Sequence, residues 1–292
     1  MPASVPAMTR PVTPVPVRLA RILRLVVHVA RGLWVVHTRY ASLPPGRQDE
    51  ELRRWARELL AILRVEVRCH NAPETLPERC LLVSNHVSWL DIFAVYAVAP
   101  GLFVAKSEIR DWPVVGDLVR RVGTLFIERG NRRHARRTNE RMVAALETGR
   151  LVAVCPEGTT TDGRSLRHFH AALLQPAIDA RALVLPVALR FVDHDGAQSD
   201  APVYVDDTSL AASLWRIATM PVMAVELRFA PYVSAESQHR RELTQRVHGL
   251  IARELGLLHG HTASERPADP RAGSPSEGRP TRNPYPAPAD PG

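Results

Sequence analysis

The sequence predicts an α/β fold, in which helices flank a central sheet. From about residue 66 onward, short apolar runs alternate with amphipathic stretches of helical length, which is the order of elements in an α/β domain. Several of these runs lack polar alternation, as expected for strands buried on both faces. The chain has 292 residues, 45 % of them hydrophobic, so it is long enough to bury a substantial core.

The predicted strands are the apolar runs between chain breaks. They lie at residues 65–68, 80–84, 102–105, 124–128, 151–155, 183–189 and 222–229. The predicted helices lie between and after them, at residues 88–97, 131–148, 171–180 and 237–258. Gly149 is well placed to end the second of these helices. Pro186 interrupts an apolar run, which indicates a bulge or an edge strand at that point.

The segment VRLARILRLVVHVARGLWVVHTRY, residues 17–40, predicts an amphipathic helix. It is not a clean membrane span, because a span needs about 20 mostly apolar residues. Spacings of three and four place a basic stripe on one face: Arg18, Arg21, Arg24, His28 and Arg31. The other face is largely apolar: Leu19, Leu23, Val26, Val27, Ala30, Leu33 and Trp34. The pattern is typical of a helix lying in a membrane interface. The alternative is a surface helix packed on the protein's own core.

A second amphipathic helix is predicted after the break LPPGRQDE. Its apolar stripe consists of Leu52, Trp55, Leu59, Ile62 and Leu63. The chain is therefore expected to begin with a disordered Pro-rich tail at residues 1–16, followed by a membrane-associating helix pair at 17–65. The α/β domain is expected at 66–258, and the Pro-, Gly- and Ser-rich segment 259–292 is expected to be a second disordered tail.

The chain is basic, with 38 Lys and Arg against 30 Asp and Glu and a net charge of +8. This balance suits an anionic partner such as acidic lipid headgroups, a phosphorylated substrate or an acidic carrier protein. A non-enzymatic basic protein that binds membranes or nucleic acid is the alternative from another class. No recognition helix, zinc pattern or set of stacking aromatic residues is evident, so nucleic acid is not expected as a partner.

The cysteine pattern and the N-terminus indicate a cytosolic setting. The three cysteines form no CxxC pair, which predicts neither a disulfide framework nor a zinc site. The apolar segment near the N-terminus contains arginines and lacks an obvious small-residue cleavage site, so no secretory signal is expected.

The stretch LLVSNHVSWLD, residues 81–91, ends a predicted strand and opens a predicted helix. Ser88 and Asp91 match the S-x-x-D capping box, which gives Asp91 a purely structural explanation. His86 is not explained in this way. A carboxylate in the first helical turn could bond one ring nitrogen of His86 and leave the other as a general base. A catalytic pair and a helix cap both fit the pattern.

Two further strand ends carry polar groups. In GTLFIERG, Arg129 follows an apolar strand, where a guanidinium can bind phosphate; a solvated arginine is the alternative. In VAVCPEGTTTDG, Glu157 stands at a strand end, and Gly158 lets the backbone approach a ligand closely. Sites in open α/β sheets gather outside the carboxyl ends of strands. The three strand ends together therefore predict one site.

The ordered blocks NHVSWLD, GTLFIERG, PEGTTTDG and VLPVAL resemble the lysophospholipid acyltransferase family, the 1-acylglycerol-3-phosphate O-acyltransferases of the PlsC type. The resemblance runs from about residue 53 to residue 255. It implies the glycerolipid acyltransferase fold, with a mixed, largely parallel sheet and an N-terminal amphipathic helix pair. Residues 66–258 would be the acyltransferase domain.

The resemblance also implies roles for particular residues. His86 would be the general base that deprotonates an acceptor hydroxyl, and Asp91 would orient it. The alkoxide would attack the thioester of an acyl-CoA or acyl-carrier protein without a covalent acyl-enzyme. The acceptor-binding residues implied by the family are Lys106, Arg129, Glu157, Gly158 and Thr159. No metal and no cofactor beyond the acyl donor is expected.

Two positions depart from the family pattern. Thr160 stands where an arginine often follows Glu-Gly-Thr, and Phe169-His170 stands where a Phe-Lys pair is common. Both changes remove cations near the acceptor site. Lys106 and Arg129 could suffice for a phosphate, or Arg164 and Arg167 could substitute. The acceptor could instead be a different lyso-lipid, such as a lyso-ornithine lipid.

The expected function is therefore acylation of the sn-2 hydroxyl of 1-acylglycerol-3-phosphate to give phosphatidic acid. The expected partners are the membrane surface, a lysophospholipid and the acyl donor. The expected location is the cytoplasmic face of the inner membrane, as a peripheral or monotopic protein. The sequence leaves the oligomeric state, the acyl-chain length and the choice of donor open.

Overall fold

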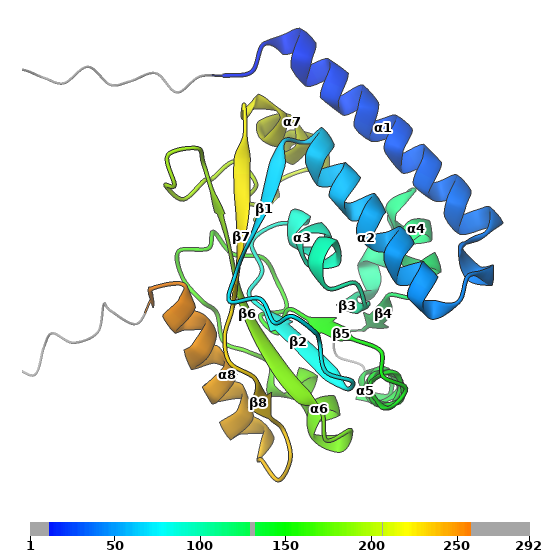
Figure 1. Ribbon diagram of the computed structural model, residues 1–292, viewed down its shortest axis with the longest axis vertical. Coiled ribbons are helices and arrows are strands. Elements are labelled where there is room, and N and C mark those ends of the chain that lie inside the picture. Colours follow the sequence, from blue (N-terminus) through cyan, green and yellow to red (C-terminus); the bar gives the residue numbers. More distant parts are fainter. Residues whose placement is uncertain (1–11, 129–131, 206, 258–292) are drawn as a thin grey trace, which may run out of the picture. The chain divides into compact units, whose positions relative to one another are not determined.

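A mixed sheet runs through the computed structural model, which describes residues 12–128, 132–205 and 207–257 (Figure 1). In this part of the chain the strand order is β1-β7-β6-β2-β5-β3-β4, and β8 pairs with β6. The strands are β1 (Val65–His70), β2 (Cys80–Ser84), β3 (Leu102–Lys106), β4 (Leu125–Ile127), β5 (Val152–Val154), β6 (Leu183–Val192), β7 (Met223–Phe229) and β8 (Val233–Ser234). All pairs are parallel except β6 with β7 and β6 with β8. The predicted largely parallel sheet is confirmed.

Helices cover both faces of the sheet. One hydrophobic core joins it to α2 (Pro45–Ile62), α3 (Leu90–Val98) and α7 (Leu210–Thr219), and a second joins it to α5 (Arg132–Glu147), α6 (Gln175–Asp179) and α8 (Arg240–Glu254). In β2, Leu82 enters the first core, whereas Leu81 and Val83 enter the second. Successive strand residues point to opposite faces, so a strand between two cores needs an unbroken apolar run.

Several element boundaries differ from the prediction. The single helix predicted at 171–180 is two elements, a 3₁₀ turn η3 (Ala171–Leu173) and α6, because Pro176 fits only the first turn of a helix. The last helix begins at Arg240 rather than at 237, since Ser237 has a φ of 57°. The helix predicted from 88 begins at Leu90.

Short elements were missed by the prediction. They are α4 (Val115–Arg121), the 3₁₀ turns η1 (Tyr40–Ser42) and η2 (Ser107–Asp111), β8, and α7. A local signal for α7 was present, because the Ser209 side chain accepts a hydrogen bond from the N–H of Ala212 as an N-cap.

Pro186 lies in a central strand, so the predicted edge strand is wrong, whereas the alternative of a bulge agrees with a register shift of one residue at this point. It pairs with Val83 on one side, inside the β2–β6 ladder. On the other side β6 changes partner, from β8 at Leu183 and Val184 to β7 from Val187 onward. The Pro186 carbonyl accepts from the N–H of Ala230, in the gap between β7 and β8. Proline has no N–H to donate, and at Pro186 β6 lies between its pairings with β8 and β7. The absence of this donor therefore breaks no hydrogen bond of either pairing.

The N-terminal helix α1 (Val15–Thr38) packs against α2, α4 and α7. Part of its basic stripe faces inward: Arg21 and His28 are buried, and Arg21 donates to the Met220 carbonyl at 2.6 Å. The apolar stripe faces outward, with these large side chains exposed: Leu19, Leu23, Val26, Val27 and Trp34. Within residues 12–128, 132–205 and 207–257, none of the helices combines the length and the hydropathy of a transmembrane span.

Candidate active site

The carboxyl ends of β2, β3, β4 and β5 lie at one edge of the sheet, because these strands are joined by parallel pairs. This edge receives the loop that follows Ser84, the loop that follows Val154, and Lys106 at the end of β3. Arg129 follows β4 but lies outside the described residues. The edge is where three of the four sequence blocks converge.

His86 and Asp91 contact one another directly. Nδ1 of His86 lies 2.8 Å from Oδ2 of Asp91. The same oxygen accepts the N–H groups of Val87 at 2.7 Å and Ser88 at 3.0 Å. Asp91 stands in the first turn of α3 and is 1 % exposed, whereas the His86 side chain is 21 % exposed. The carboxylate therefore serves both the helix start and the imidazole, and the ring remains accessible.

The acceptor-only carboxylate fixes the tautomer of His86. Oδ2 of Asp91 already accepts two main-chain N–H groups, and a carboxylate can only accept. The third contact, with His86, is therefore a hydrogen bond in which Nδ1 carries the proton and donates it. Nε2 is then the nitrogen with a lone pair, which is the arrangement needed for a general base.

The loop after β5 clamps the main chain of His86 from both sides. Oε1 of Glu157 accepts the N–H of His86 at 2.9 Å, and the His86 carbonyl accepts the N–H of Thr161 at 2.8 Å. The second Glu157 oxygen, Oε2, accepts the N–H of Arg167 at 2.9 Å. Glu157 is 4 % exposed. Burial raises the pKa of its carboxyl, and the hydrogen bonds from Arg167 and His86 act in the opposite direction.

Asn85, which forms a polar pair with His86 in the sequence, is a further site residue to which the sequence pattern assigned no role. Its side-chain amide donates to the Leu189 carbonyl at 2.9 Å and accepts the Leu189 N–H at 2.7 Å. The amide thereby continues the β2–β6 ladder after the main chain of β2 has turned away at Ser84. Asn85 is 1 % exposed. The signal in the sequence was a polar residue placed directly between a buried strand and His86.

The remaining predicted residues within the described part of the chain lie on the same edge. Gly158 adopts a φ of 66° in the turn after Glu157, and Thr159 follows it, half-buried. Thr160, the first departure from the family pattern, donates its hydroxyl hydrogen bond to the Tyr204 carbonyl. Lys106 is half-buried at the end of β3.

The cationic substitutes suggested by the sequence are of two kinds. Arg164 forms an ion pair with Asp200 at 2.7 Å. Arg167 and His170 are exposed on the segment beside the Glu157 loop, where the His170 N–H donates to the Pro156 carbonyl at 2.9 Å. Of the two suggested substitutes, Arg164 is thus paired with a carboxylate and Arg167 is exposed; His170 is the second departure from the family pattern.

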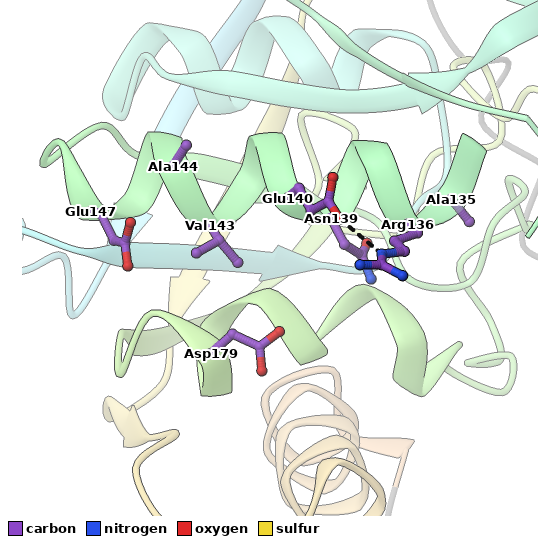
Figure 2. Close-up of a pocket in the computed structure, with 8 residues that line it drawn as sticks. All are labelled: Ala135, Arg136, Asn139, Glu140, Val143, Ala144, Glu147 and Asp179. Carbon is purple, nitrogen blue, oxygen red and sulfur yellow. Dashed lines mark hydrogen bonds and ion pairs between the residues drawn. The ribbon is translucent and has the colours of Figure 1, made fainter. Parts of the chain in front are cut away.

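A groove of about 640 Å³ lies elsewhere, between α5 and α6 (Figure 2). Its lining residues are Ala135, Arg136, Asn139, Glu140, Val143, Ala144, Glu147 and Asp179. Arg136 and Glu140 form an ion pair at 2.9 Å on its rim. None of the predicted site residues lines it, so this groove is separate from the His86 site.

The chain is similar to known acyltransferases. A family model described as Acyltransferase matches residues 65–190. A 1-acyl-sn-glycerol-3-phosphate acyltransferase of Neisseria meningitidis is 37 % identical over 79 % of this chain and 90 % of its own length. A lyso-ornithine lipid O-acyltransferase of Pseudomonas aeruginosa is 35 % identical over 86 % of this chain and 98 % of its own length.

The fold also matches a solved structure. The crystal structure of PlsC from Thermotoga maritima, a 1-acyl-sn-glycerophosphate acyltransferase, superposes with a TM-score of 0.60. The match covers 85 % of this chain and 100 % of that one, at 21 % identity. The family match, the two relatives and the shared fold lead to one conclusion: the chain is an acyltransferase and belongs to the family that contains the 1-acyl-sn-glycerol-3-phosphate and lyso-ornithine lipid acyltransferases.

Proposed function

We propose that this enzyme transfers a fatty acyl group from an acyl thioester to the sn-2 hydroxyl of 1-acylglycerol-3-phosphate and so forms phosphatidic acid. The observation that carries the proposal is the His86–Asp91 contact at the carboxyl edge of the sheet, in a chain whose relatives include enzymes named for this reaction. The reaction needs no metal or organic cofactor, because the thioester itself supplies the activated carbonyl.

The proposed mechanism uses Nε2 of His86 as a general base. Nε2 removes the proton from the acceptor hydroxyl as its oxygen attacks the thioester carbonyl carbon. The tetrahedral intermediate collapses, the carbon–sulfur bond breaks, and the thiolate takes the proton back from the imidazolium. Asp91 stabilises that imidazolium through Nδ1 and keeps the ring oriented.

The test is substitution of the two residues. His86→Ala is expected to abolish transfer in an assay with lysophosphatidate and acyl-CoA, with unchanged circular dichroism. Asp91→Asn is expected to lower kcat by about 10⁴-fold, because an amide favours the wrong imidazole tautomer. Full activity of His86→Ala would refute the mechanism.

The acceptor headgroup is proposed to bind at Lys106, Arg129, Gly158 and Thr159, in line with the family pattern. Lys106 ends a strand at the same edge as His86. The Gly158 turn offers close backbone approach, which suits a phosphate. Loss of the Arg129 guanidinium should chiefly raise the KM for the acceptor, whereas an unchanged KM would remove Arg129 from the site.

Lyso-ornithine lipid is the second candidate acceptor. Thr160 is uncharged, so position 160 adds no cation to the site, and its hydroxyl donates to the Tyr204 carbonyl. The relative from P. aeruginosa carries this lipid in its name. Separate kcat/KM values for lysophosphatidate and lyso-ornithine lipid, with one acyl donor, decide between the two; a clear preference for the phosphate-free acceptor would replace the leading proposal.

The acyl donor is proposed to be acyl-CoA or acyl-carrier protein, both of which carry negative charge. The exposed arginines of α5 include Arg133, Arg137 and Arg141, spaced four residues apart along one helical face. Such a stripe favours an anionic partner. Rates measured with each donor over a series of salt concentrations would show which donor depends on this charge.

The enzyme is further proposed to act at a membrane surface, on the cytoplasmic side. The outward apolar stripe of α1 supports this, because Leu23, Val27 and Trp34 are each more than half exposed. The inward basic residues Arg21 and His28 fix that orientation through contacts with the protein. Leu23→Ser with Val27→Ser should release the protein from vesicles.

A further inference from the structure

The segment between η2 and α4 forms a turn with two exposed apolar side chains. Trp112 is 38 % exposed and Val114 is 52 % exposed. The turn follows β3 and η2 directly, so it extends from the strand whose carboxyl end carries Lys106. Two large apolar side chains in one short turn beside an active-site edge are not explained by the catalytic mechanism.

The backbone of this turn is strained. Val114 has φ 67° and ψ −55°, and the Val115 N–H donates to the Pro113 carbonyl at 2.7 Å. These values define a γ-turn of the rare, strained kind, and a β-branched residue is a clear outlier there. Strain of this type persists only where the surroundings enforce it, and it gathers at functional sites.

The surroundings enforce the turn from both sides. The Trp112 N–H donates to the Ile109 carbonyl at 3.2 Å. The Gly116 N–H donates to the Trp112 carbonyl at 2.9 Å. A Cβ at Gly116 would lie 2.0 Å from the Arg110 carbonyl oxygen, so only glycine allows α4 to pack this closely on η2. These contacts hold the backbone of the turn in a conformation that leaves both apolar side chains exposed.

The turn is joined to the outward stripe of α1. α1 packs against α4, and His37 near the end of α1 forms an ion pair with Asp117 of α4 at 3.0 Å. Trp34, one turn earlier, is 61 % exposed. Arg24, ten residues before Trp34 in α1, is also exposed and has no ion-pair partner in the part of the chain that the structure describes. Exposed tryptophans, and an exposed arginine on the same helix as one of them, suit a bilayer interface with anionic headgroups.

We infer that the Trp112–Val114 turn is a second membrane-inserting element, which enters the same phospholipid bilayer as α1 and brings the His86 edge to the lipid surface. The inference rests on the proposed membrane association of the enzyme. Because the acceptor is an amphiphile, an edge held at the interface can receive its hydroxyl without the lipid leaving the bilayer.

The test compares the full-length enzyme with Trp112→Ser/Val114→Ser on vesicles of phosphatidylcholine and phosphatidylglycerol in equal parts. The matched control is Leu76→Ser. Leu76 is 37 % exposed, and it lies in the loop before β2, at the opposite edge of the sheet. The double variant should lose at least about tenfold in vesicle affinity, and Leu76→Ser should lose nothing. Activity toward a short-chain acceptor dispersed as monomers should stay unchanged in both.

A second measurement does not depend on whether the double variant folds correctly. Trp112→Phe keeps an apolar ring, so vesicle binding should remain, but quenching of tryptophan fluorescence by brominated phosphatidylcholine should decrease relative to the unmodified enzyme. Unchanged quenching, or unchanged vesicle affinity of the double variant, would overturn the inference. So would an equal loss of activity toward the dispersed acceptor, which would assign the turn to the active site.

The vesicle-binding results distinguish a failure of this inference from a failure of the proposed membrane association. If Leu23→Ser/Val27→Ser in α1 releases the protein from vesicles and the turn variant does not, only the inference fails. If neither variant affects vesicle binding, the proposed membrane association fails as well.

Discussion

Glu157 uses both of its carboxylate oxygens on main-chain N–H groups. One is on His86 and the other on Arg167. Its side chain is buried, and its ionised form is disfavoured by that burial. The family pattern implies an acceptor-binding role, but no oxygen of Glu157 lacks a protein donor. The geometry favours a positioning role instead, in which Glu157 links His86, the proposed general base, to the exposed segment that carries Arg167 and His170.

Glu157→Gln separates these two roles. In glutamine an NH₂ group replaces one of the two carboxylate oxygens. This group is itself a donor and cannot accept the main-chain N–H that it faces, so the loop that carries His86 must shift. We expect kcat to fall by about 100-fold, as for misplacement of a catalytic group by about 1 Å, with little change in the KM for the acceptor. Steady-state kinetics with varied acceptor measure both. The amide proton of His86 should also move upfield in the NMR spectrum, because it loses a carboxylate partner.

Asp193→Asn is the matched control. Asp193 is also a buried carboxylate, and its Oδ1 accepts the N–H groups of Asp195 and Ala197, but it serves the turn after β6. Its substitution should leave kcat unchanged. A raised acceptor KM at constant kcat in Glu157→Gln would restore the acceptor-binding role.

At the residue scale, the pattern of a short stretch of sequence predicts only contacts between residues within that stretch. The His86–Asp91 pair spans five residues, and its contact was one of the two alternatives that the local pattern predicted, beside the helix cap. The bond between His86 and Glu157 joins residues 71 apart, and the bonds between Asn85 and Leu189 join residues 104 apart. Spacing along the chain carries no signal for such contacts, because they depend on which strands become neighbours.

At the scale of elements, the crossing of α1 and α2 depends on one glycine. A Cβ at Gly32 would lie 2.6 Å from Nε1 of Trp55. The Trp55 ring stacks on His28 and packs against Phe93, so it cannot easily move. Gly32→Ala should therefore destabilise the protein by about 1–3 kcal/mol, as overpacking does, although alanine is the better helix former. Thermal or denaturant unfolding measures this change.

Gly249 provides the contrast for this experiment. It lies in α8 and has open space around its Cβ position. Gly249→Ala should stabilise the protein by up to about 1 kcal/mol through helix propensity alone. Equal stabilisation by the two substitutions would show that α1 does not pack on Trp55.

The α1–α2 contact should also respond to pH. Burial lowers the pKa of His28 below its ordinary value of 6.5, and the hydrogen bond to the Trp55 carbonyl, together with the charge of Glu58, acts in the opposite direction. The unfolded chain therefore binds this proton more readily than the folded one. The stabilising contribution of His28 is complete above 6.5 and is lost as the pH falls through the lowered folded pKa.

The measurement is the melting temperature of the protein and of His28→Gln between about pH 7.5 and pH 5.5, the range in which histidines titrate. The protein should lose more stability on acidification than the variant. Parallel curves would mean that His28 is not protonated more easily on unfolding.

Element prediction succeeded where burial alone sets the pattern. The strand at 80–84 was predicted to the residue, since both of its faces enter a core. Pro186 does not lie in an edge strand, because the interruption that accommodates it is the change of partner from β8 to β7, which is a property of the sheet and not of β6. The amphipathic pattern of α1 was recognised, but which stripe faces the protein depends on Arg21 and its carbonyl partners near the end of α7.

At the scale of the whole molecule, the fold brings loops from distant parts of the chain to one edge of the sheet. The sequence predicted that edge, because the carboxyl ends of parallel strands meet there. It could not predict how the outward stripe of α1 and the Trp112–Val114 turn are placed, since these depend on tertiary packing. Both features suit an enzyme whose acceptor and product are lipids.

Mass-spectrometric analysis of the products tests whether the enzyme acylates lysophosphatidate and whether it does so through His86. The enzyme and His86→Ala would each be given one acyl-CoA with equal amounts of lysophosphatidate and lyso-ornithine lipid in mixed vesicles. We expect the enzyme to form phosphatidic acid as the main product and His86→Ala to form none. Acyl transfer by His86→Ala at the rate of the unmodified enzyme, or a product mixture without phosphatidic acid, would contradict this expectation.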